Sequence, residues 1–285
     1  MTALLYGLGA ALGWGIADYL AALASRRNGT FRTILGMQAS SLLLFTIGLA
    51  LVGQLPTLGL EAWLVALAMG ALGAAMLAAL YRALALGPIA IVSPVAAANA
   101  AITVLLAVVL LREALSPLQV AAIAATIGGT ALASTDLRVL RETLGRPTAG
   151  VLLALAAMVG FGVLGFLLAA ASRAFGVIAM VLLLRAGTTA VLLAYATVRS
   201  ANLALLPRRA LALVVLIGIL DTSANVSFGL GAVSGYASIV ATGASAYPLI
   251  PFALGLTLLR ERIAPNQFVG VALLLAGLAT LGFGG

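Results

Sequence analysis

Long apolar runs alternate along the chain with short breaks rich in arginine, glycine and proline. A helix that spans a membrane needs roughly 20 apolar residues, and ten runs come close to this length. We predict spans at residues 3–23, 31–52, 62–83, 88–110, 118–134, 149–171, 177–197, 209–230, 236–258 and 266–283. The expected fold class is therefore an all-α membrane protein with ten transmembrane helices.

The second half of the chain repeats the first. With a shift of 148 residues, the string Leu-Leu-Arg-Glu at 110–113 falls on the same string at 258–261, and residues 87–132 match at 16 of 46 positions. With a shift of 147, Gly-Trp-Gly at 13–15 falls on Gly-Phe-Gly at 160–162. Internal similarity of this kind indicates a duplicated structural unit.

The repeat predicts how the chain is organised. We expect a first five-helix repeat at 1–134, a cytoplasmic linker at 135–148 and a second repeat at 149–285. Because five is odd, the second repeat must enter the membrane from the opposite side. Inverted repeats are typical of secondary transporters, in which the substrate site lies between the two copies near the midplane.

Composition excludes most other classes of protein. The chain is 64% hydrophobic and 8% charged, with a mean hydropathy of +1.24, and it contains no Cys, His or Lys. Thiolate metal sites, imidazole bases and Schiff-base chemistry are therefore excluded. We expect no catalytic residues, no metal and no cofactor, since an intramembrane enzyme would depend on a few scattered acids.

All fifteen basic residues are arginines, and they give a net charge of +8. They lie in the breaks between apolar runs, which favours contact with membrane lipids over nucleic acid. Twelve fall in one set of alternate loops and two in the other, whereas Arg185 lies inside a span. Because cytoplasmic loops carry the excess of arginine, we expect a bacterial inner (plasma) membrane protein with both termini periplasmic.

These features resemble a known family. Ten spans as five plus five, the Gly-Trp-Gly at 13–15 and an Arg-Glu closing the fourth and ninth spans are similar to the drug/metabolite transporter (DMT) superfamily and its EamA family. The resemblance implies a bacterial exporter of amino acids, including aromatic ones, or of other metabolites, working by alternating access through a central cavity without ATP. Many members of the family are expected to have both termini in the cytoplasm, which is the reverse of the arginine pattern.

Aromatic and polar residues at mid-span are the candidate substrate-binding groups, because such groups are costly in hydrocarbon unless they face a cavity or a partner. They are Trp14, Tyr81, Asn99, Phe161 and Tyr247. Trp14 and Phe161 could instead fill packing grooves, and Tyr81 could belong to the interfacial aromatic belt. Asn99 could join neighbouring helices by a hydrogen bond rather than bind a ligand.

Three prolines predict breaks in the helices beside this site. Pro94 lies in the fourth span, and Pro248 and Pro251 lie one turn apart in the ninth. Proline removes a backbone hydrogen bond, so neighbouring groups or a water-lined cavity must satisfy the freed carbonyls. Kinked packing without ligand contact is the alternative.

Charges inside spans are the candidate gating or coupling residues. Arg185 and Asp221 fall near the centres of neighbouring spans and predict an ion pair, which Asn225 could join from one turn away. Asp18 could titrate in a proton antiporter or neutralise a nearby arginine. Glu113 and Glu261 each follow an arginine, which predicts interfacial charge pairs.

The combined hypothesis is an exporter that binds a small-molecule substrate, with amino acids as the first choice, and acts as a monomer. The alternative is a proton-coupled multidrug exporter of the same superfamily, in which Asp18 or Asp221 would bind cationic or aromatic compounds. A channel or a structural scaffold belongs to a third class, and saturable counterflow between two solutes would exclude the channel.

Overall fold

In a computed structural model, the described residues are 1–86, 95–96, 98–135, 137, 149–199, 206–250, 253 and 264–283, and all regular elements among them are helical. The helices are α1 (Thr2–Asn28), α2 (Thr30–Leu51), α3 (Leu60–Leu86), α5 (Asn99–Leu110), α6 (Pro117–Ala133), α8 (Ala149–Phe175), α9 (Val177–Val198), α10 (Arg208–Ser234), α11 (Ala237–Ala244) and α13 (Pro265–Phe283). Within these residues seven helices are long and apolar enough to cross a membrane. The prediction of an all-α membrane protein is confirmed.

Several helices are longer than the apolar runs that predicted them. Helix α1 ends at Asn28 rather than at residue 23, and α8 ends at Phe175 rather than at 171. A helix satisfies its own backbone groups, so it continues through polar residues until something stops it. Here the stops are Gly29 and Gly176, with φ angles of 83° and 85°, a conformation that favours glycine.

The predicted ninth span, 236–258, is interrupted close to the prolines that suggested a break in it. Helix α11 ends at Ala244, and the chain continues in tight turns, in which the amide of Tyr247 donates to the carbonyl of Ala244 at 3.1 Å. Pro248 follows directly and cannot donate a backbone hydrogen bond, which favours a break in the helix at this point.

The fourth span has the same turns at the equivalent place. The amide of Ala98 donates to the carbonyl of Val95 at 3.2 Å, and 148 residues later the amide of Ala246 donates to the carbonyl of Gly243, also at 3.2 Å. Helix α5 begins only at Asn99, so the described part of this span is shorter than the predicted 88–110. Each half therefore contains one interrupted span at the same position of the repeat. We call the turns around Ala98 and Asn99, and around Ala246 and Tyr247, the loosened segments.

The helices also pair in the same way in both halves. Helices α1 and α8 each have 27 residues, and the pairs α2 with α9 and α3 with α10 match in length at 22 and 27 residues. Helix α1 packs on α10 and α11. Helix α8 packs on α3, the equivalent of α10, and on α5, which belongs to the fourth span as α11 belongs to the ninth. The contacts α2 with α9 and α6 with α13 join equivalent helices of the two halves.

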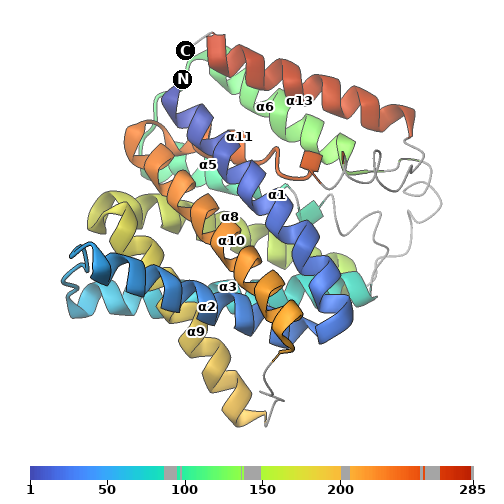
Figure 1. The fold of residues 1–285 in the computed structure, drawn as a ribbon. Coiled ribbons are helices and arrows are strands. Elements are labelled where there is room, and N and C mark those ends of the chain that lie inside the picture. The colour runs from blue at the N-terminus through green and yellow to red at the C-terminus, as the bar shows by residue number, and fades with distance from the viewer. Residues whose placement is uncertain are drawn as a thin grey trace.

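Figure 1 shows the resulting arrangement. Helices α6 and α13 lie side by side at one edge of the bundle, and α2, α3 and α9 lie towards the opposite edge. The two chain ends lie together at one end of the molecule. Between the edges, a hydrophobic core draws side chains from α1, α3, α5, α8, α9, α10 and α11. The two loosened segments adjoin this core.

Candidate functional site

Two glycines bring long helices against the loosened segments. A Cβ added to Gly15 in α1 would lie 2.7 Å from the carbonyl oxygen of Tyr247, and one added to Gly162 in α8 would lie 2.6 Å from that of Asn99. Only a residue without a side chain permits so close an approach. Each loosened segment is therefore in close contact with a glycine from the opposite half of the chain. The two glycines occupy corresponding positions in the repeat.

The residue before each of these glycines is aromatic. Trp14 precedes Gly15 and is half-buried, with its ring 5.7 Å from that of Phe228 and tilted by 42°. Phe161 precedes Gly162 and is also half-buried. Both residues thus directly precede a glycine that contacts a loosened segment. Because each is only partly covered by its neighbours, each can contribute surface to a solute.

The two polar residues of the loosened segments differ in character. The side-chain amide of Asn99 donates to the carbonyl of Ala96 at 3.0 Å, within its own turn. This bond satisfies a carbonyl that the interrupted helix leaves without its usual donor. Tyr247 is half-buried and packs against a second apolar cluster built mainly from α6 and α13.

A charged cluster lies between α2, α9 and α10. One terminal nitrogen of Arg185, Nη1, contacts the carboxylate of Asp221 at 2.5 Å and the amide oxygen of Gln38 at 2.5 Å. Arg185 is 1% exposed, whereas the Asp221 side chain is 18% exposed. The ion pair between neighbouring helices is present as the sequence pattern predicts.

Gln38 is the residue of this cluster that sequence reasoning missed. A signal was present, because Gln38 and Arg185 correspond in the repeat at a shift of 147. Within the described part of the chain, Nε and Nη2 of Arg185 have no hydrogen-bond partner. A buried guanidinium with unused donors can hold an anionic oxygen, and the Nε–Nη2 edge suits a carboxylate.

Asn225 and Asp18 lie beside this cluster in different ways. The side-chain amide of Asn225 donates to the backbone carbonyl of Asp221 at 2.7 Å, so it bonds to the helix rather than to the carboxylate. Asp18 lies close enough to Asp221 and to Tyr247 to interact with both electrostatically, yet its side chain is exposed. Asp18 therefore lies within electrostatic reach of α10 and of the turns after α11, and it keeps exposed surface.

Three predicted site residues cannot be placed. The side chain of Tyr81 and all of Pro94 and Pro251 lie outside the described residues. Pro248 lies in the turns that follow α11. No group of three or more His, Cys, Asp or Glu within the described ranges could hold a metal ion.

Glu113 differs from its predicted role as an interfacial charge beside Arg112. The structure buries it at 6% exposure and pairs it with Arg173 at 3.2 Å instead. Arg112 has a positive φ of 53° and is exposed. The turn after α5 therefore directs the two side chains apart, which adjacency in the sequence did not predict.

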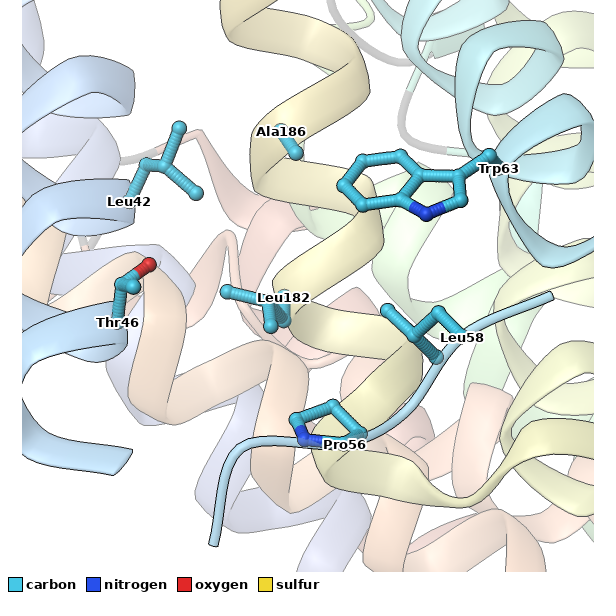
Figure 2. A pocket seen from close by; sticks show the side chains of 7 residues that line it. All are labelled: Leu42, Thr46, Pro56, Leu58, Trp63, Leu182 and Ala186. Carbon is cyan, nitrogen blue, oxygen red and sulfur yellow. The ribbon is translucent and has the colours of Figure 1, made fainter. Parts of the chain in front are cut away.

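An apolar groove of about 490 Å³ lies apart from these groups, between α2, α9 and the start of α3. Figure 2 shows its lining by Leu42, Thr46, Pro56, Leu58, Trp63, Leu182 and Ala186. No predicted site residue is among these described lining residues. The groove is open and mostly apolar, and the polar side-chain groups in this lining are the Thr46 hydroxyl and the Trp63 indole N–H.

Comparisons with known proteins give information on the class of protein to which this chain is similar. The model described as the EamA-like transporter family matches residues 1–135. A solved structure entitled only "Crystal structure of protein" has a TM-score of 0.80 and 20% sequence identity, and the similarity covers 100% of this chain and 99% of that chain. No curated protein matches the chain. The structural similarity extends the shared fold over both halves.

The apolar helices define a multi-pass membrane protein. Its first 135 residues, slightly less than half of the chain, are similar to the EamA-like transporter family.

Proposed function

We propose that this protein is a secondary transporter that exports small metabolites, with amino acids as the solute class, by alternating access through a central site. The observation that carries the proposal is the pair of loosened helices at Asn99 and Tyr247, each clamped by a glycine beside an aromatic ring. Discontinuous helices next to the substrate are a recurrent feature of secondary transporters. The EamA match over the first half supports the same class.

The architecture that we propose is two inverted five-helix repeats, at 1–134 and 149–285, joined by the linker at 135–148. Matching helix lengths, matching glycine contacts and matching loosened turns at shifts of 147 and 148 support it. We further propose that the arginine-rich face is cytoplasmic, which makes both termini periplasmic in a bacterial inner membrane. A single chain supplies both halves of the site, so a monomer suffices.

The chemistry around the proposed site suits a zwitterion. Asp18 is accessible and could hold an ammonium group, and the unused donors of Arg185 could hold a carboxylate. Trp14, Phe161 and Tyr247 would contact an apolar side chain, and Asn99 and Tyr81 would add polar contacts. Arg185, Asp221 and Asn225 would respond to solute and act in gating or coupling.

Transport by the purified protein in proteoliposomes tests this proposal. We expect saturable uptake and counterflow of labelled neutral amino acids. Trp14→Ala, Asn99→Ala and Tyr247→Ala should each reduce the rate about tenfold or more, which corresponds to about 1.4 kcal/mol. Trp63→Ala is the matched control, because Trp63 is the chain's other tryptophan and lines the apolar groove. Normal transport in all three site variants would remove the site assignment.

A multidrug exporter is the second candidate, and the exposure of Asp18 is the observation that favours it. An accessible carboxylate beside aromatic rings can bind a lipophilic cation. Cells that express the protein should then resist cationic dyes, and Asp18→Asn should abolish the resistance. Resistance without amino-acid counterflow would replace the first proposal with this one.

Single-cysteine labelling tests the orientation. The chain has no Cys, so each introduced thiol is unique. A cysteine at Gly59 should react with a membrane-impermeant maleimide added from the periplasm, and a cysteine at Arg27 should react only from the cytoplasm. The opposite pattern would show that both termini are cytoplasmic.

A further inference from the structure

A buried carboxylate joins the two halves of the bundle at one end. The two oxygens of Glu113 accept the backbone amides of Ala237 and Ser238 at 2.7 and 3.0 Å and the hydroxyl of Ser238 at 2.6 Å. Ala237 and Ser238 form the first turn of α11, where unpaired amides favour a negative charge. Glu113, which follows the first-half helix α5, thus caps a second-half helix.

Arg173, near the end of α8, extends this contact. Its Nη2 donates to Glu113 at 3.2 Å and to the carbonyl of Gly235 at 2.8 Å, and its Nε donates to the carbonyl of Ala232 at 2.8 Å. Four elements therefore meet at one carboxylate: the turn after α5, the ends of α8 and α10, and the start of α11. We call the group of Glu113, Arg173 and Ser238 the clasp. Within the described residues it contains the one ion pair between the halves, because Arg185 and Asp221 both belong to the second half.

The clasp lies at the end of the bundle that carries both chain termini. A Cβ on Gly235 would lie 2.9 Å from Ala3, and one on Gly282 would lie 3.6 Å from Leu4. At the opposite end, Arg26 occupies the position that corresponds to Arg173 at a shift of 147, and it is exposed. Both arginines keep exposed surface, and Arg173 in addition engages Glu113 at the terminus-bearing end.

We propose that the clasp is the gate at the terminus-bearing face, and that Glu113 must leave the first turn of α11 each time this face opens. The proposal rests on alternating access, in which each face opens only while the other is closed. The charge of Glu113 is held by four donors from the second half, and separation of α5 from α11 removes the three that Ala237 and Ser238 supply. The structure has this face closed.

Accessibility of single cysteines tests the gate without any knowledge of the solute. Ala237→Cys reports on the clasp, because Ala237 is 0% exposed. Ala154→Cys reports on the opposite end, near the start of α8, where Ala154 is also 0% exposed. The probe is a charged methanethiosulfonate reagent applied to the purified full chain.

Glu113→Gln keeps the shape of the side chain and removes its charge. We expect the labelling rate at Ala237→Cys to rise about fivefold or more. Such a rise corresponds to a loss of about one kcal/mol or more in the stability of the closed form relative to the open form. The rate at Ala154→Cys should stay constant or fall, because opening one face closes the other. Glu61→Gln is the matched control, since Glu61 is exposed in the first turn of α3 at the same end.

Equal increases at both reporters would show that Glu113 only stabilises the fold, and no increase at Ala237→Cys would also overturn the gate. If Glu113→Gln does not fold, Arg173→Gln gives the same test, because it leaves the cap on α11 and removes the ion pair. Labelling does not require transport. A positive result with no amino-acid counterflow would therefore reject the proposed solute and retain the gate.

Discussion

The first half of the bundle (residues 1–134) and the second half (149–285) share their packing and differ in their central charges. Gln38 corresponds to Arg185, and Gly73 corresponds to Asp221, so the buried ion pair belongs to the second half alone. In the other direction, Asp18 corresponds to Gly165. Duplicated packing thus sets the positions of the helices, while each half fills the centre with different polar groups. A site between such halves is asymmetric even though its frame is repeated.

The ion pair gives the largest expected difference between the halves. Asp221→Ala leaves the Arg185 charge buried with Gln38 as its remaining hydrogen-bond partner among the described residues, and it should lower the free energy of unfolding by about 3 kcal/mol. The double variant Arg185→Gln with Asp221→Ala makes this region like the first half and should recover most of the loss. Unfolding in detergent, followed by circular dichroism, measures both. A double variant less stable than the single one would contradict this view of the pair.

Substitutions at Gly13 and Gly160, where helices cross at close distance, should give the next largest difference in stability between the halves. A Cβ at Gly13 would meet the backbone carbonyl of Leu220 at 3.0 Å and Ala224 at 2.8 Å, whereas one at the equivalent Gly160 would meet only the flexible side chain of Met76. Gly13→Ala should therefore cost about 2 kcal/mol through overpacking, and Gly160→Ala less than about 1 kcal/mol.

Thermal unfolding in the same detergent compares the two variants. Gly48→Ala is the control, because a Cβ there meets nothing within 4 Å and alanine favours the helix. Equal losses at Gly13 and Gly160 would show that the first crossing is as adaptable as the second.

The interhelical turns should respond equally in both halves. Gly29 and Gly176 both have positive φ and nothing within 4 Å of an added Cβ, so only backbone strain opposes a side chain. Gly29→Ala and Gly176→Ala should each lower stability by about 1 to 2 kcal/mol. Gly59→Ala, which has open space and no positive φ, should be neutral in the same unfolding measurement. Unequal losses would mean that the two turns are not equivalent.

The smallest expected difference lies at the start of α6. Ser116 and Gln119 form a capping box with bonds of 3.2 and 2.9 Å, whereas the equivalent start of α13 has Ala264 and keeps only the glutamine arm at 2.9 Å. Ser116→Ala would make the first half like the second and should cost about 0.5 to 1 kcal/mol. No change in the midpoint of thermal unfolding would show that the hydroxyl contributes nothing there.

Part of this architecture was determined by the sequence alone. Apolar runs predicted the membrane class and the approximate helices, because a helix in lipid must be apolar over its whole length. The repeated string at 110–113 and 258–261 predicted equivalent elements, and the described helices recur at those shifts. The charges of Arg185 and Asp221 predicted their own pairing, since an isolated charge at that depth is costly.

Only the tertiary structure decided which groups meet across the halves. Glu113 lies beside Arg112 in the sequence but binds Arg173 and the first turn of α11, because the turn after α5 directs the neighbouring side chains apart. Gln38 joins Arg185 because α2 and α9 cross at equivalent positions. Periodicity and hydropathy report how one segment meets lipid. They hold no information on the distance between segments that come together only when two halves of a chain pack.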